Sequence, residues 1–194
     1  MENIVHGTSA PPYCQIRATY DETTIRVYQA YSDVIADAAL AAGTFITPPF
    51  KMERMTWIKP SFLWMMYRSG WGLKDAAQKR ILSIDMTRTG FDWALEHGCL
   101  SHADELLGKD EWIAKKAASP VRIQWDPERD LLLRPLNHRT IQIGLSKEAI
   151  SRYVNEWICG IKDVTPLAHE IHELVQTKEF GEAQAKLPIE RPML

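Results

Sequence analysis

Apolar and polar residues alternate in two late segments of the chain, 121–126 and 140–145. A period of two places successive side chains on opposite faces of a strand, so both segments are expected to be half-buried strands. The turn-forming residues at 126–130 indicate that the two strands form an antiparallel pair. Similar patterns predict a strand over 13–20 and shorter strands over 55–58 and 81–86.

Helical spacing of apolar residues predicts the remaining elements. One helix is expected between the N-cap Asp21 and the stop at Gly43, because apolar side chains recur there every three or four residues. Pro60 suits the first turn of a second helix, over 62–68, which Gly70 ends. Further helices are predicted over 91–97, within 102–118, over 146–158 and over 166–178.

This irregular order of about five strands and five or six helices favours the α+β class, a mostly antiparallel sheet packed with helices. The 194 residues, 45% of them apolar, can form one substantial core, so we expect a single domain over 1–194. Its core should cover about 13–178. The leader 1–12 and the proline-containing tail 187–194 are expected to be mobile.

Charge and cysteine content narrow the class of protein further. The net charge of −2, from 23 basic and 25 acidic residues, excludes a strongly basic arm for nucleic acid. Three widely spaced cysteines indicate a reducing compartment. No apolar run approaches the roughly 20 residues that a membrane span needs, so we expect a cytoplasmic protein with no membrane partner.

Basic and aromatic side chains are interleaved over residues 51–88. Eight basic residues stand against three acidic ones there, among Trp57, Trp64, Tyr67 and Trp71. Such a mixture can stack on a base while it neutralises phosphate. The alternative is that the tryptophans belong to the core and the lysines to a solvated surface.

The sharpest local feature in this stretch is Lys59-Pro60-Ser61, at the predicted start of a helix. Free backbone N–H groups and the helix dipole attract an anion there, and an ammonium and a hydroxyl stand beside them. We therefore expect a phosphate or carboxylate to bind. In the alternative, Ser61 only caps the helix and Lys59 points to water.

Polar residues on the predicted strands offer a second group. Arg17, Arg122 and Gln142 occupy the polar phase of their strands, and Arg88 follows another strand. If the strands are neighbours, these side chains face one cavity, where arginine can bind phosphate and glutamine can bind a base edge. Arginine on an exposed strand face also serves solubility alone.

Carboxylates and histidines supply weaker candidates. Asp85 and Asp126 are the first candidates for a general base, with an ion pair or a turn as the alternative. His169 and His172 are three residues apart rather than the four of a zinc helix, so we assign them to a solvated face and expect no metal.

Several runs resemble a known family: R54-M-T-W-I-K-P-S-F-L-W-M-M66, V121-R-I-Q-W-D-P-E128 and I141-Q-I-G-L145. On these, with I16-R-A-T-Y-D21, V27-Y-Q-A-Y31 and P48-P-F50, the chain is identified as a member of the domain of unknown function 4291 family, over roughly 13–175. The resemblance implies a small single-domain protein and brings no established activity.

A second similarity is to ADP-ribosyltransferases, whose first core strand ends with an arginine that holds the nicotinamide dinucleotide. Arg17 in Q15-I-R-A-T-Y-D21 is similar. The chain departs from those enzymes at Gly144, where they place a glutamate.

Together these patterns predict an Arg- and Trp-lined pocket for a phosphorylated ligand: a nucleotide, a dinucleotide such as NAD, or a nucleic-acid end. A nucleotide-transfer enzyme is one form of this hypothesis. The alternatives are a non-enzymatic module for RNA or single-stranded nucleic acid, and a protein-interaction domain. The predicted ligand-binding residues are Arg17, Tyr20, Lys59, Ser61, Trp64, Arg68, Arg88, Arg122 and Gln142.

Overall fold

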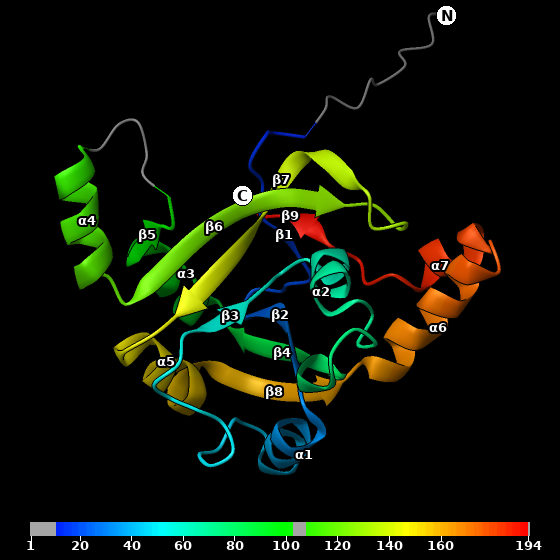
Figure 1. Cartoon of the computed structure of the whole chain (residues 1–194), viewed down its shortest axis with the longest axis horizontal. Helices are drawn as coiled ribbons and strands as arrows, with labels where there is room; N and C mark the ends of the chain where they lie inside the picture. Colours follow the sequence, from blue (N-terminus) through cyan, green and yellow to red (C-terminus); the bar gives the residue numbers. More distant parts are fainter. Residues whose placement is uncertain (1–10, 103–107, 194) are drawn as a thin grey trace, which may run out of the picture.

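A computed structural model describes residues 11–102 and 108–193, whose strands form three sheets (Figure 1). The central sheet has the order β2-β4-β8 and is antiparallel throughout. Its strands are β2 (Thr24–Tyr31), β4 (Arg80–Thr87) and β8 (Ile158–Asp163). The predicted strand over 81–86 is confirmed as β4, in which five of the eight residues are buried.

A four-stranded sheet, β3-β7-β6-β5, covers the central sheet. Its strands are β3 (Thr56–Ile58), β7 (Pro135–Leu145), β6 (Val121–Arg129) and β5 (Gly98–Leu100). The predicted antiparallel pair of β6 and β7 is confirmed, but its turn lies at 130–134 rather than 126–130. The Asp130 side chain accepts hydrogen bonds from the Leu132 and Arg134 amides at 2.9 Å each, which fixes the turn there.

One backbone contact joins these two sheets. Tyr28 pairs with Ser83 of β4 on one edge of β2, and on the other edge its amide donates to the carbonyl oxygen of Lys59 at 2.7 Å. Pro60 follows Lys59 and has no N–H, so the pairing cannot continue. The chain turns at once into helix α2 (Phe62–Ser69), which confirms the helix predicted after Pro60.

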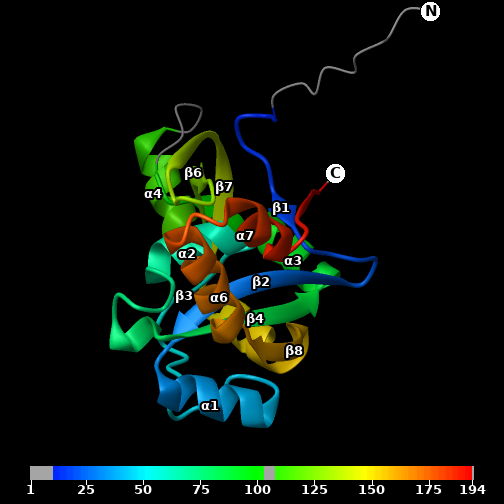
Figure 2. The same ribbon diagram turned by 90° about the vertical axis from the view of Figure 1, so that its right-hand side faces the viewer.

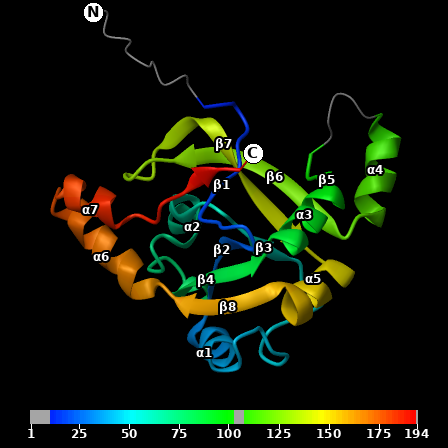
Figure 3. The same ribbon diagram turned by 180° about the vertical axis from the view of Figure 1, so that it is seen from behind.

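Helices cover the outer faces of the sheets. Figure 2 shows α1 (Asp33–Ala42) on the side of the central sheet away from β6 and β7, and Figure 3, the view from behind, shows α3 (Arg88–Glu96) in front of the sheets. The helix α6 (Thr165–Gln176) packs against α7 (Phe180–Lys186). The other helical segments are α4 (Lys109–Ala118), α5 (Glu148–Arg152), the π-helical turn Tyr153–Trp157 and the 3-10 turn Ala76–Gln78. Residues 103–107 of the helix predicted within 102–118 lie outside the described residues.

The main core lies between the two large sheets. Ile25 and Val27 of β2 and Ile141 and Ile143 of β7 are at most 1% exposed and belong to one apolar cluster. Burying an aliphatic side chain of this size contributes roughly 1.5–3 kcal/mol. A second cluster, around Met66 and Ile171, packs α2 against α6. The chain is therefore a single α+β domain, as the sequence predicts.

The helix predicted between Asp21 and Gly43 is half wrong. Residues 24–31 form β2, and only 33–42 form a helix, which Gly43 ends in the left-handed conformation at φ 72°. Isoleucine, valine and tyrosine in β2 favour a strand, and the eight-residue pairing with β4 outweighs their helical spacing. Asp21 instead holds the turn before β2, where its carboxylate accepts from the amides of Thr23 and Thr24.

The helix predicted over 146–158 is shorter than expected. It begins after Lys147, passes into the π-helical turn, and ends where β8 begins at Ile158. Pairing of β8 with β4 ends it, and the helix predicted over 166–178 then follows as α6.

The C-terminal segment was expected to be mobile, but residues 187–193 pack against the domain. Here β9 (Arg191–Pro192) pairs with β1 (Arg17–Ala18), the only two residues of the predicted strand 13–20 that form a regular strand. Glu190 reaches further inward, and its Oε1 accepts the Phe62 amide at the start of α2 at 2.7 Å. This carboxylate fixes the tail on α2.

The Glu190 carboxyl has an unusual protonation equilibrium. Burial and the nearby Glu128 raise its pKa to about 8, against the hydrogen bond from Phe62 and the charge of Arg17. Because the folded pKa exceeds the unfolded value, ionisation costs stability as pH rises from about 4.5 to about 8.

We expect Glu190→Gln to raise the free energy of unfolding at pH 8 by on the order of 4 kcal/mol, because the amide oxygen still accepts from Phe62 and carries no charge. The gain should vanish near pH 4, where the native carboxyl is protonated. Urea unfolding at both pH values measures it, with the exposed Glu22→Gln as control. Equal stability of the variant and the native chain at pH 8 would contradict the assignment.

Candidate functional site

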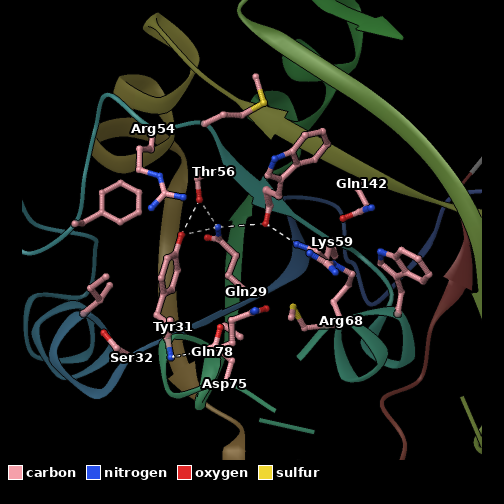
Figure 4. Close-up of a pocket in the computed structure, with 18 of the residues that line it drawn as sticks. Gln29, Tyr31, Ser32, Arg54, Thr56, Lys59, Arg68, Asp75, Gln78 and Gln142 are labelled. Atoms are coloured by element: carbon pink, nitrogen blue, oxygen red, sulfur yellow. Dashed lines mark hydrogen bonds between the residues drawn. The ribbon is translucent and has the colours of Figure 1, made fainter. Parts of the chain in front are cut away.

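A cavity of about 770 Å³ opens where the two large sheets meet α2. Its walls come from β2, β3, β6, β7 and α2, together with the loops around 49–55 and 75–78. Figure 4 shows side chains from these elements pointing toward one another. The Tyr28–Lys59 contact that joins the sheets lies beside the cavity and places its walls.

Gln29 organises a buried hydrogen-bond network at one wall. Its amide nitrogen donates to Thr56 Oγ1 at 2.6 Å, Tyr31 Oη at 2.9 Å and the Trp57 carbonyl at 3.3 Å, and its Oε1 accepts from Tyr153 Oη at 2.9 Å. Burial raises the pKa of Tyr31 to about 12, so its hydroxyl keeps its proton. With all its polar atoms engaged, Gln29 is a rigid part of the wall.

Lys59 is the unusual group of the cavity, because its side chain is inside the protein. The residue is 7% exposed, and its Nζ donates to the Trp57 carbonyl at 3.0 Å. Burial and the positive charge of Arg68 lower its pKa from 10.5 to about 7, while Asp126 acts in the opposite direction. A large fraction of this amine is therefore neutral at physiological pH.

Asp126 is held by two carboxamides that also line the cavity. Gln142 donates to its Oδ2 at 2.5 Å and Gln124 to its Oδ1 at 3.0 Å (Figure 4 labels Gln142). Asp126 thus presents an oriented carboxylate to the cavity. The other candidate base, Asp85, forms a two-pronged ion pair with Arg26 at 2.7 and 2.9 Å, outside the cavity.

Arg54 and Arg68 also line the cavity; both residues are exposed, and neither makes a side-chain hydrogen bond or ion pair with another described residue. In the view of Figure 4 they lie on opposite sides of Gln29. The indole nitrogen of Trp64, which is 4% exposed, has no partner among the described residues either. The cavity therefore offers unused donors.

Four of the predicted ligand-binding residues line this cavity: Lys59, Trp64, Arg68 and Gln142. Ser61 does not. Its hydroxyl caps α2 by accepting the Trp64 amide at 3.1 Å and donates to Glu128 at 2.8 Å, while Glu190 takes the Phe62 amide. The prediction of an external anion at this helix start is wrong, because carboxylates of the chain itself occupy the position.

The other predicted residues lie elsewhere, so the expectation that Arg17, Arg122 and Gln142 face one cavity is wrong. Arg17 donates to Gln15 and to the Glu190 carbonyl at 3.2 Å each, and Arg122 donates to carbonyls at the end of α4, among them that of Ser119 at 3.1 Å. The hydroxyl of Tyr20 donates to the Pro192 carbonyl at 2.7 Å, and the guanidinium of Arg88 lies over the Tyr20 ring at 4.9 Å. These side chains hold the tail and the sheet edges.

Sequence reasoning missed Arg54, Gln29 and Gln124 as parts of the cavity. Gln124 carried a usable signal, because it shares a strand face with Asp126 two residues later. Gln29 carried none, since its strand was predicted as a helix.

Gly144 lies against the wall of the cavity. A Cβ here would lie 2.6 Å from Met55 Sδ and 3.1 Å from the Trp57 ring, and both residues line the cavity. A glutamate at 144 would displace this wall.

We expect Lys59→Met to stabilise the fold at pH 7. Because the unfolded lysine binds its proton more tightly, Lys59 lowers the free energy of unfolding. The loss is on the order of 4 kcal/mol at pH 7 and about 2 kcal/mol at pH 9. Methionine has similar length and removes this cost, so the gain in unfolding free energy should shrink between the two pH values. Urea titrations measure it, and the exposed Lys162→Met should change stability by less than about 0.5 kcal/mol. A loss of stability in Lys59→Met at pH 7 would show that Lys59 is held as a charged group.

No helix among residues 11–102 and 108–193 has the length and apolarity to cross a membrane. In the same residues, no group of three His, Cys, Asp or Glu side chains is placed to hold a metal ion.

Comparison with known proteins identifies the family. A search of curated proteins found no match. The family described as Domain of unknown function (DUF4291) matches residues 15–193, which include both large sheets and every wall of the cavity. The chain therefore belongs to the DUF4291 family.

Proposed function

We propose that the cavity binds a phosphorylated ligand that carries a planar base, namely a nucleotide, a dinucleotide or a nucleic-acid end. The proposal rests on one observation, namely which arginine side chains have a hydrogen-bond or ion-pair partner in the protein. Every other arginine donates a hydrogen bond or forms an ion pair within the described residues, as Arg26 and Arg80 do. Arg54 and Arg68 alone have no such partner there, and both line one cavity. Unused guanidinium groups in a shared cavity suit the oxygens of phosphate.

Aromatic and carboxamide side chains supply the complement to a base. Trp57, Trp64 and Tyr67 line the cavity, and such rings can stack on any base. Gln78, with Gln124 beside Asp126, offers hydrogen-bonding groups for a base edge. The volume of about 770 Å³ is within the usual range for small-molecule sites.

Exposure of the aromatic residues favours a pocket over an open groove. Every tryptophan is buried or half-buried, so none is an exposed stacking platform on the surface. Tyr67, at 41% exposed, is the exception among the aromatic residues that line the cavity, and the Arg129 guanidinium lies 3.6 Å from its ring centre. An exposed ring beside a cation suits a base that continues outward, as at the end of a single strand of RNA.

Nucleotides that bind the native state should raise the melting temperature. A ligand at 100 times its Kd adds about 2.7 kcal/mol, and each kcal/mol moves the midpoint of a domain of this size by about 2–4 °C. We expect a shift with adenine dinucleotides or nucleoside phosphates. Arg54→Ala should reduce it most, because it removes a charge-assisted contact to phosphate, and Arg68→Ala should reduce it because it lowers the positive charge of the cavity.

Two controls separate the cavity from a general charge effect. Arg17→Ala and His169→Ala change groups outside the cavity and should keep the shift, with each variant compared with its own unliganded midpoint. A broad nucleotide panel without any shift, combined with salt-dependent binding of single-stranded RNA, would replace the pocket with the nucleic-acid module.

A further inference from the structure

Lys51 and Lys59 are the lysines among the described residues that line the cavity, and of the two Lys59 alone is buried. Its backbone is fixed by the Tyr28 amide at 2.7 Å, and the residue is 7% exposed. No carboxylate among the described residues forms an ion pair with it. The amine donates one hydrogen bond, to the Trp57 carbonyl at 3.0 Å.

This geometry suits a neutral amine better than an ammonium. An ammonium needs partners for three N–H groups and a counter-charge, whereas a neutral amine that donates once to Trp57 keeps its lone pair for another atom. The charged groups that act on it are Arg68 from α2 and Asp126 from β6. Desolvation beside a second cation is a known way to make lysine a nucleophile.

We propose that Lys59 forms an imine with an aldehyde or ketone carbon of a phosphorylated compound bound in the cavity. This inference rests on the proposed function, because the cavity must first hold the phosphate, at Arg54. It extends that function from reversible binding to covalent chemistry at a named atom.

The step balances without an oxidant or reductant. The Nζ lone pair attacks the carbonyl carbon and forms a C–N bond, while the π electrons move to oxygen, which takes up the proton that nitrogen releases. The nitrogen lone pair then expels that oxygen as water, with one further proton supplied from solution. The carboxylate of Asp126, fixed by Gln124 and Gln142, stabilises the positive iminium that forms.

Pyridoxal 5′-phosphate is the probe, because it joins a phosphate, a planar ring and an aldehyde in one small molecule. The protein is incubated with the probe, reduced with borohydride, digested, and mapped by mass spectrometry. We expect the reduced adduct at Lys59, formed increasingly as pH rises through about 7. The adduct should be absent in Lys59→Arg and Lys59→Met and unchanged in the exposed Lys162→Arg.

The outcomes separate the two proposals. If nucleotides shift the melting temperature but the label falls on exposed lysines equally in the native chain and in Lys59→Met, the imine is overturned and the binding site stands. If neither nucleotides nor the probe bind, the proposed function is overturned, and the imine proposal is overturned with it. Adduct at Lys59 that nucleoside phosphates suppress supports both, and Lys59→Met serves as the folded variant because it keeps the length of the side chain.

Discussion

The hydrogen bond from the Tyr28 amide to the Lys59 carbonyl is the contact on which the cavity depends. It ties β2 of the central sheet to the end of β3 in the covering sheet. Because Pro60 has no backbone N–H to donate, the pairing stops after this one contact, and the chain continues into α2. Residues of both sheets line the cavity next to this contact. A longer β2–β3 ladder would extend the contact between the sheets at the position of the cavity.

Two ionisable groups, the buried Lys59 and the half-buried Glu190, lie on either side of the N-terminus of α2. Lys59 comes before the helix on the cavity side, and Glu190 meets its first amide from the tail. Burial raises the pKa of Glu190 and lowers that of Lys59, so both shift toward their neutral forms. Glu190 has a structural reason, since it holds the tail. Lys59 has no comparable structural partner beyond the Trp57 carbonyl, and groups of this kind cluster at functional sites.

Local elements could be predicted from the sequence better than their arrangement in space. The β6–β7 pair and α2 were predicted correctly, because alternation in the one case and Pro60 with Gly70 in the other are local signals. The helix predicted across β2 failed because pairing with β4 is a long-range interaction. Lys59, Trp64 and Arg68 were predicted together because they lie close together in sequence, and all three line the cavity. Arg17 and Arg122 were misplaced because alternation along a strand shows which side chains point away from the core, but not which part of the molecule they face.

The cavity also sets the direction in which a phosphorylated ligand should lie. A phosphate beside Arg68 would bring negative charge near Lys59 and raise the pKa of its amine, which favours the ammonium. A phosphate held by Arg54 lies on the other side of Gln29 from Lys59 in Figure 4 and has a weaker effect on that amine. The reactive or base end would then meet Lys59, Trp64 and the amides around Asp126. Binding is thus compatible with a neutral lysine when the ligand places its phosphate at Arg54 and its uncharged end at Lys59.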